Sequence, residues 1–178
     1  MLNMYSRTGG KLLGRGRMFR RRGGSVLELA LTLSILFSIC YGLIEFGYYF
    51  YIKNTMEGAV REGCRAGIVT GATMSTCNSA IENQLQAAGL VANNASISGS
   101  GGTYTIGSNY SITYYDTPSG SVTETAIADL TSSSIPVGDT LTVKIQATWS
   151  VVGQGFRPAG IIGASKVLST ASSMRKEG

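Results

Sequence analysis

Residues 20–51 read RRRGGSVLELALTLSILFSICYGLIEFGYYFY. Behind the arginines and glycines, an apolar run extends from Ser25 to Ile52. As a helix it would be about 42 Å long, which is enough to cross the hydrocarbon core of a bilayer and reach the headgroups. The run is too long for the apolar part of a secretory signal. It contains two acids, Glu28 and Glu45, and an acid so near the start of a hydrophobic helix needs a physical reason.

Positive charge is concentrated in front of this run. Seven basic residues precede Gly23, whereas only Lys53 lies close to the other end. The positive-inside rule therefore predicts a cytoplasmic N-terminus and an exported chain beyond about residue 53. Residues 23–178 hold eight basic and ten acidic side chains, so the net charge of +5 belongs to the leader. A nucleic-acid partner is not expected for the body of the protein.

Further features of the run agree with a membrane span. Glu28 and Glu45 are 17 residues apart, about 25 Å along a helix, so they bracket the hydrocarbon slab. Glu45 is interpreted as an acid near the outer boundary, and residues 48–51 as an aromatic cluster at the interface. Small residues recur at every fourth position and would let another helix approach closely: Ala30, Ser34, Ser38 and Gly42.

Composition argues against an enzyme. The chain has no histidine, its three cysteines lack CxxC spacing, and its acids are scattered singly. No constellation for a metal, a cofactor or a nucleophile with its base is apparent. The glycine run at 99–107 lacks the strand, helix and Lys-Ser/Thr of a phosphate loop, and is interpreted as a flexible connector.

Beyond Lys53 the helix is predicted to continue and to become amphipathic, with one narrow face made of Met56, Ala59, Val60, Gly63 and Gly67. Gly71 is expected to break it. A second amphipathic helix follows over 75–90, capped by Ser75 or Thr76 and stopped at Gly89.

After residue 90 the sequence turns to Ser, Thr, Gly and Tyr in short alternating runs. Strands are predicted at 109–115, 139–152 and 165–174, enough for three or four antiparallel strands packed on a helix. The segment 153–163 is interpreted as an apolar loop.

The fold class is therefore α+β, a long N-terminal helix followed by a short helix and a small antiparallel sheet. The predicted organisation has four parts: a basic cytoplasmic leader at 1–23, a transmembrane helix at 24–52, an extramembrane helical region at 53–89 and a β-rich exported domain at 90–178.

The stretch RRRGGSVLELALTLSILF resembles the N-terminus of type IV prepilin-like proteins. Members of that superfamily carry a basic leader, a glycine with a cut directly after it, and a glutamate at the fifth mature position. Here a cut after Gly23 makes Gly24 the first mature residue and Glu28 the fifth.

The continuation YGLIEFGYYFYIKNTMEGAVREGCRAGIV, residues 41–69, resembles the TadE-like family of minor pilins, and the closing LSTASSMRKEG is similar more weakly. The resemblance implies a bacterial inner-membrane protein with a cytoplasmic N-terminus and an exported C-terminal domain. It further implies a lipid bilayer, a prepilin peptidase, other pilin subunits and pilus assembly proteins as partners, no cofactor, and a structural role in a Tad (Flp) adhesive pilus.

Two other classes stay open. The helix would be a simple anchor if the exported domain were a surface binding module, which an exposed aromatic row would favour. The sequons at 94 and 109 would fit a glycosylated eukaryotic membrane protein, although such triplets arise often by chance in Ser-rich sequence.

Processing supplies a reason for Glu28. The cut after Gly23 creates a positive amine on Gly24, four residues before Glu28 and on the same helix face. That amine is neutralised by Glu28 of its own chain or, in the pilin-like interpretation, of a neighbouring subunit. Cys64 and Cys77 are predicted to form a disulfide, because they face an oxidising compartment and lie at similar distances from the break at Gly71.

Overall fold

The computed structural model describes residues 21–93, 95–130, 135–153 and 158–176, with side chains from Gly23 onward. The chain falls into two compact units, which divide between Ile39 and Cys40. Most of the predicted leader, up to Arg20, lies outside the described residues.

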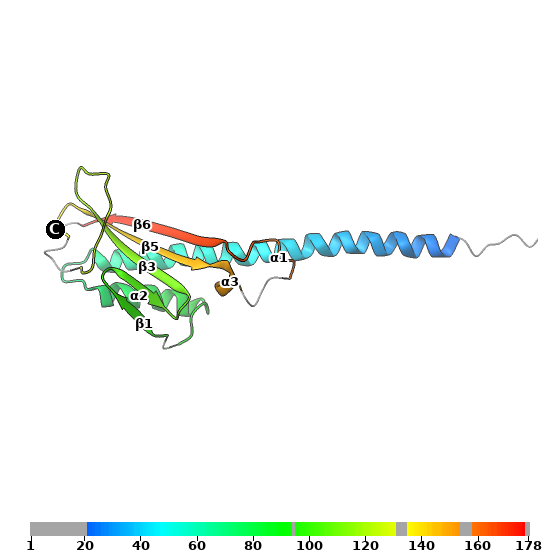
Figure 1. The fold of residues 1–178 in the computed structure, drawn as a ribbon, viewed down its shortest axis with the longest axis horizontal. Helices are drawn as coiled ribbons and strands as arrows, with labels where there is room; N and C mark the ends of the chain where they lie inside the picture. Colours follow the sequence, from blue (N-terminus) through cyan, green and yellow to red (C-terminus); the bar gives the residue numbers. More distant parts are fainter. Residues whose placement is uncertain (1–20, 94, 131–134, 154–157, 177–178) are drawn as a thin grey trace, which may run out of the picture. The chain divides into compact units, whose positions relative to one another are not determined.

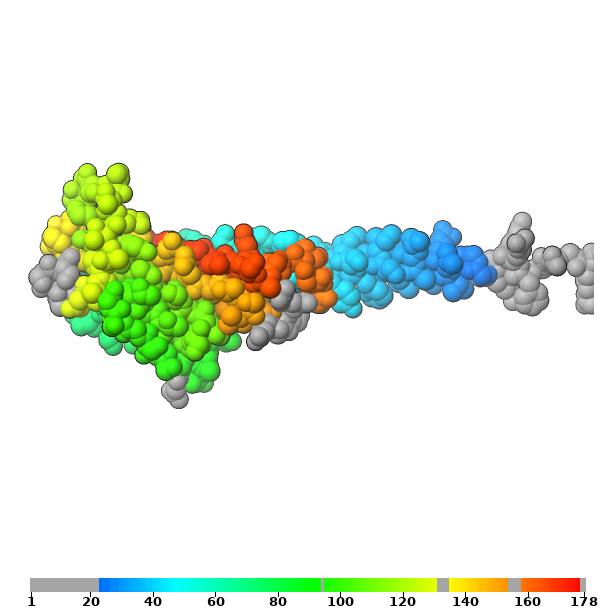
Figure 2. All heavy atoms as spheres, viewed as in Figure 1, coloured from blue at the N-terminus to red at the C-terminus, as the bar shows by residue number. Residues whose placement is uncertain are grey.

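Helix α1, Arg21–Gly67, begins in the first unit and ends in the second. In the first unit its leucine-rich sequence favours a helix, drawn in blue in Figure 2, and its large apolar side chains are exposed. The exposed residues there are Val26, Leu27, Leu29, Leu31, Leu33, Ile35, Leu36, Phe37 and Ile39.

In the second unit α1 is packed along one stripe. Buried residues recur at intervals of three or four, the spacing of one helix face: Gly42, Glu45, Ile52, Met56, Ala59, Val60, Gly63, Cys64 and Gly67. The predicted narrow face from Met56 to Gly67 is confirmed. The helix ends at Gly67, four residues before the predicted break at Gly71, where φ is +79°.

Helix α2, Met74–Ala87, packs on α1 with its apolar side, including Cys77, Ile81 and Leu85. Its N-cap is Thr73, whose hydroxyl accepts from the backbone N–H of Thr76 at 3.2 Å. The predicted caps, Ser75 and Thr76, were therefore wrong by two or three residues. The predicted stop is confirmed, since Gly89 follows the helix with φ of +70° and its N–H donates to Gln86 O.

The described residues form a six-stranded antiparallel sheet in the order β1-β2-β3-β5-β6, with β4 paired to β3 beside β2. Figure 1 shows β3, β5 and β6 side by side. The bounds are β1 Ile97–Ser100, β2 Thr103–Ile106, β3 Tyr110–Thr117, β4 Thr125–Ala126, β5 Thr140–Thr148 and β6 Val167–Arg175. The α+β fold class is thus confirmed, with more strands than expected.

The glycine run at 99–107 is part of the sheet, so its interpretation as a flexible connector was wrong. Strands β1 and β2 form a hairpin in which Ser100 pairs with Thr103 across a two-residue turn. Gly101 and Gly102 both have positive φ, 68° and 87°, which such a turn requires. A Cβ on Gly102 would lie 2.0 Å from the Ile127 carbonyl oxygen, so only glycine fits there.

The predicted strand 139–152 was too long at its C-terminal end. Strand β5 stops at Thr148, and Trp149–Val152 forms the short helix α3. The Trp149 ring is fully buried against Gly153, where an added Cβ would come within 2.7 Å of the ring. Burying this large side chain fixes the chain reversal between β5 and β6 more strongly than strand propensity would.

One hydrophobic core joins α1, α2 and the inner face of the sheet. Along β3, Tyr110, Ile112, Tyr114 and Asp116 are buried and alternate with half-exposed residues, as expected for a strand with one covered face. The hydroxyl of Tyr114 donates to Asn78 Oδ1 at 2.6 Å, which satisfies the buried polar groups of both side chains.

Candidate functional site

The candidate functional surface is the part of α1 with exposed large apolar side chains, from Val26 to Ile44. The described residues contain one helix long and apolar enough to cross a membrane, with a mean hydropathy of 2.0 over its most apolar window. This helix and its exposed leucines and isoleucines are consistent with a membrane-anchored, single-pass protein.

The predicted processing residues lie at the start of this surface. Gly23 and Gly24 are helical, and an added Cβ at either position would meet nothing within 4 Å. Packing among the described residues therefore gives no reason for glycine at these two positions. Glu28 is exposed, and its backbone carbonyl accepts from the Thr32 hydroxyl at 2.8 Å. Cleavage after Gly23 and an assembly role for Glu28 stay predictions.

Glu45 has a role that the sequence interpretation missed. It is fully buried, and its two carboxylate oxygens accept the backbone N–H groups of Ile161, at 3.1 Å, and Ile162, at 2.9 Å. Hydrogen bonds to a charged acceptor are stronger than neutral ones. Glu45 thus ties the loop before β6 to α1. No local pattern in the sequence reveals this pairing, because the partners are backbone groups more than a hundred residues away.

The aromatic cluster 48–51 is divided between the core and the surface. The Tyr48 and Tyr49 rings lie 6.1 and 5.5 Å from the Trp149 ring, and both tyrosines are half-buried. Phe50 and Tyr51 are exposed, and the Tyr51 hydroxyl donates to Ala88 O at 2.7 Å. Two of the four predicted interface aromatics therefore pack under the sheet domain.

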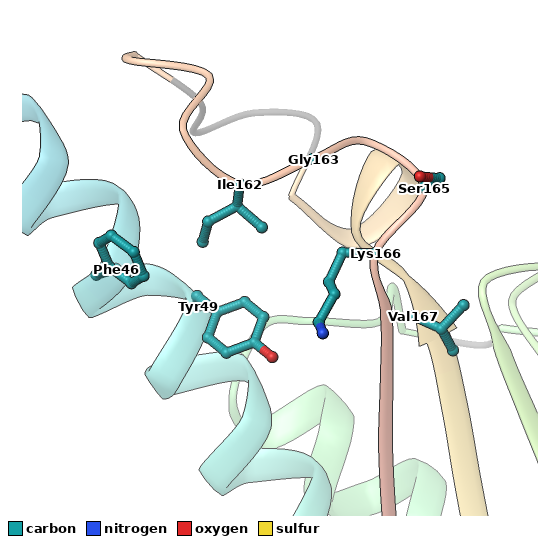
Figure 3. Close-up of a pocket in the computed structure, with 7 residues that line it drawn as sticks. All are labelled: Phe46, Tyr49, Ile162, Gly163, Ser165, Lys166 and Val167. Atoms are coloured by element: carbon teal, nitrogen blue, oxygen red, sulfur yellow. The ribbon is translucent and has the colours of Figure 1, made fainter.

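An open pocket of about 640 Å³ lies beside the Glu45 contact. Figure 3 shows Phe46 and Tyr49 on α1 at one side and Ile162 above them, with Lys166 extending from the loop toward the helix. Gly163, Ser165 and Val167 complete the lining. The lining is mostly apolar, with a lysine at its side.

The predicted disulfide partners meet in the core. Cys64 and Cys77 are fully buried, and the structure contains both as thiols, with Cys64 Sγ donating to Ser172 O at 3.0 Å. Burial raises the pKa of Cys64 to about 11 and that of Cys77 to about 12. The disulfide in the exported protein stays a prediction. Cys40 is an exposed thiol.

Among the described residues, no group of three His, Cys, Asp or Glu side chains is placed to hold a metal ion. The nearest approach to a polar site is a pair of acids, Asp116 and Asp139, at one end of the sheet. Burial, and next the charge of Asp139, raise the pKa of Asp116, whose Oδ1 has no hydrogen-bond partner. Asp139 accepts instead from the Ser119 N–H at 2.8 Å.

The segment that carries these features matches a known family. Residues 23–65 match the family model described as TadE-like protein. This segment is TadE-like. The matched residues include both acids of the apolar run and most of α1, and they confirm the resemblance seen in the sequence. No match was found among curated proteins or among solved structures. The family indicates a protein associated with Tad pili.

Proposed function

We propose that this protein is a minor pilin that acts through protein contacts, not catalysis, in the assembly of a Tad (Flp) pilus. The observation that carries the proposal is the coincidence of the TadE-like segment, 23–65, with a helix whose large apolar side chains are exposed up to Ile44. Such a surface is unfavourable in water and favourable in lipid or against other apolar helices.

The membrane concerned is proposed to be the bacterial inner membrane, with the N-terminus in the cytoplasm and the sheet domain outside. The support is the charge distribution, since seven basic residues precede Gly23 and only Lys53 lies close after the apolar run. Protease added to spheroplasts should therefore reach the sheet domain, and in the uncleaved Gly23→Arg variant it should leave the leader intact.

Processing is proposed to occur between Gly23 and Gly24. Because a side chain at either position would meet open space, the fold itself does not require these glycines. A peptidase that must bind the chain closely at the cut would require them. The cut leaves a positive amine on Gly24, one helical turn before Glu28.

Glu28 is proposed to bind the Gly24 amine of a neighbouring subunit. A carboxylate inside a membrane span costs about 2.5 kcal/mol or more unless it is paired. Pairing between subunits would relieve this cost only in one axial register, so the acid would set how the helices dock. Pairing within one chain would relieve it equally well, and this is the alternative that must be separated.

The test uses Glu28→Gln and Gly23→Arg in cells with an active prepilin peptidase. Wild-type protein should have Gly24 at its N-terminus by mass spectrometry, and Gly23→Arg should retain the leader. Glu28→Gln should insert in the membrane but lose co-purification with other pilins, because the amide cannot neutralise an amine.

Glu57→Gln is the matched control. Glu57 lies on the same helix, where it pairs with Arg61 on the exposed side, and exposed pairs of this kind contribute little. Its substitution should leave assembly unchanged. If Glu28→Gln were cleaved, inserted and incorporated at wild-type levels, the intermolecular role of Glu28 would be wrong.

A further inference from the structure

The pocket beside Glu45 has two walls of different chemistry. One wall is Phe46 and Tyr49 of α1, which present apolar rings. The other is the loop from Ile162 to Lys166, held in place because Glu45 accepts the Ile162 N–H at 2.9 Å. The loop wall of the pocket is therefore held against α1 by the buried hydrogen bond between Ile162 and Glu45.

The position of the pocket along α1 indicates its surroundings. In the second unit, Leu43 and Ile44 of α1 are exposed, two and three residues before Phe46. The lining residue Val167 is 49% exposed, and Ile161, next to the lining residue Ile162, is 54% exposed. Within the second unit, exposed apolar side chains thus occur on α1, on the loop and at the start of β6. Aromatic residues such as Phe46 and Tyr49 are of the kind that settles between hydrocarbon and headgroups.

The charge of the pocket indicates its occupant. Lys166 is exposed at the side of an otherwise largely apolar pocket, and it is the basic side chain among the lining residues. A lysine with an apolar stem suits a ligand that has an anionic head and a hydrocarbon tail. Lysine side chains near a membrane surface attract the headgroups of anionic lipids.

We propose that this pocket binds an anionic phospholipid, with the Lys166 ammonium at the phosphate and the acyl chain against Phe46 and Ile162. The proposal rests on the membrane anchoring proposed above. A bound lipid would fix the height and rotation of the sheet domain at the membrane surface, because the loop and α1 would both contact it.

Trp149 offers a direct readout, because it is the single tryptophan and its ring lies 5.5 Å from that of Tyr49. The full chain is reconstituted in phosphatidylcholine vesicles that contain a minor fraction of brominated lipid, either phosphatidylglycerol or phosphatidylcholine. Brominated chains quench tryptophan at short range. We expect the anionic brominated lipid to be enriched about five-fold over the neutral one near Trp149, the factor that one lysine at a membrane surface provides.

Lys166→Gln should abolish this preference while leaving the emission spectrum of buried Trp149 unchanged. Lys53→Gln is the matched control, since Lys53 is also exposed near the apolar run but does not line the pocket. It should retain the preference. Gly163→Leu should reduce quenching by both brominated lipids, because Gly163 lines the pocket and a Cβ there meets nothing within 4 Å.

Several results would overturn the proposal. The first is equal quenching by the two brominated lipids in the wild type. The second is a preference for the anionic lipid that survives Lys166→Gln. The third is a preference that Lys53→Gln removes as completely as Lys166→Gln does. Quenching that falls as the protein-to-lipid ratio rises would show a second copy in the pocket and would also overturn it. Flotation separates the two proposals: protein that floats with vesicles but shows no preference refutes the lipid site alone, whereas protein that does not float refutes the membrane anchor.

Discussion

The two parts of α1 use one backbone conformation for opposite purposes. Before Ile44 the helix exposes leucine, isoleucine and phenylalanine on every side, and after Glu45 it buries a stripe that contains Gly63 and Gly67. Large apolar side chains that are exposed suit a lipid environment, whereas a buried stripe with glycines suits a sheet and a second helix that approach closely. The difference shows that packing against the sheet and α2, and not hydrophobicity alone, separates the anchor from the core.

The largest expected effect is on the alkylation rate of Cys64 and Cys77, which should differ between the folded and the denatured chain. Burial raises the pKa of Cys64 from its ordinary 9.0 to about 11, so its thiolate fraction near neutral pH falls about a hundredfold. For Cys77 the pKa rises to about 12. Native protein in detergent should therefore be alkylated at both sites at least a hundred times more slowly than denatured, reduced protein, as measured by peptide mass spectrometry.

The same chemistry decides the predicted disulfide. In denatured, unreduced protein, three reactive thiols would exclude a bridge between Cys64 and Cys77, whereas a single thiol, from Cys40, would establish it. Rapid alkylation of Cys64 in the native state would contradict the buried position found here.

Gly67→Leu should break the packed part. A Cβ at Gly67 would lie 2.5 Å from Leu141 Cδ2 and 3.0 Å from Cys77 Sγ, and overpacking of this kind lowers the free energy of unfolding by about 3 kcal/mol. The melting temperature of the full chain in detergent, followed by near-UV circular dichroism, should fall by roughly 10 °C.

Gly58→Leu is the matched control on the same helix. Gly58 is exposed and an added Cβ meets nothing within 4 Å, so the change should be neutral or stabilise the helix by about 0.5 kcal/mol. Equal losses at Gly58 and Gly67 would mean that the small-residue stripe is not what permits packing.

Much of this contrast could be predicted from the sequence because it depends on local periodicity. The spacing of Met56, Ala59 and Val60 defines a helix face whatever packs on it, and the alternation in 109–115 defines a strand. The TadE-like segment was likewise recognisable from residues 20–70. Local pattern was insufficient where a neighbour distant in sequence determines the outcome.

Three examples show why the rest was missed. The Gly101–Gly102 turn reads as flexible until Ile127 is seen against it. Trp149 continues an alternating pattern, yet its burial against Gly153 ends the strand. Glu45 resembles an acid at a membrane boundary, and only the folded loop supplies the two N–H groups that bind it.

Glu45→Ala should release the loop at Ile161 and Ile162 from α1, at the start of the packed part of the helix. Removing the carboxylate leaves the N–H groups of Ile161 and Ile162 without their acceptor, which costs about 2 kcal/mol. Hydrogen–deuterium exchange at these two amides should accelerate, while the amides of α2 keep their protection. Glu45→Gln retains one acceptor oxygen and should have about half the effect. Unchanged exchange in Glu45→Ala would show that the loop is held by other contacts.

The smallest expected change in stability is at Asp116, on strand β3 of the sheet that packs on α1. This acid is 8% exposed, its Oδ1 has no partner, and it pairs across the sheet with Leu141, the residue that meets Gly67. Burial, followed by the charge of nearby Asp139, raises its pKa in the folded state above the ordinary 3.8. The folded state therefore binds the proton more tightly than the unfolded chain does, and the contribution of Asp116 to stability falls as pH rises through the folded pKa.

Asp116→Asn should remove this loss of stability at high pH, because the amide does not ionise. At pH 7 the variant should be more stable than wild type by about 1 kcal/mol, roughly 3 °C in melting temperature, and the gain should shrink as pH falls toward the ordinary carboxyl pKa. Glu124→Gln is the control, because Glu124 is exposed beside β4 and has no comparable desolvation. If Asp116→Asn melted below wild type at pH 7, the Asp116 carboxylate would be hydrogen-bonded in solution and would stabilise the fold.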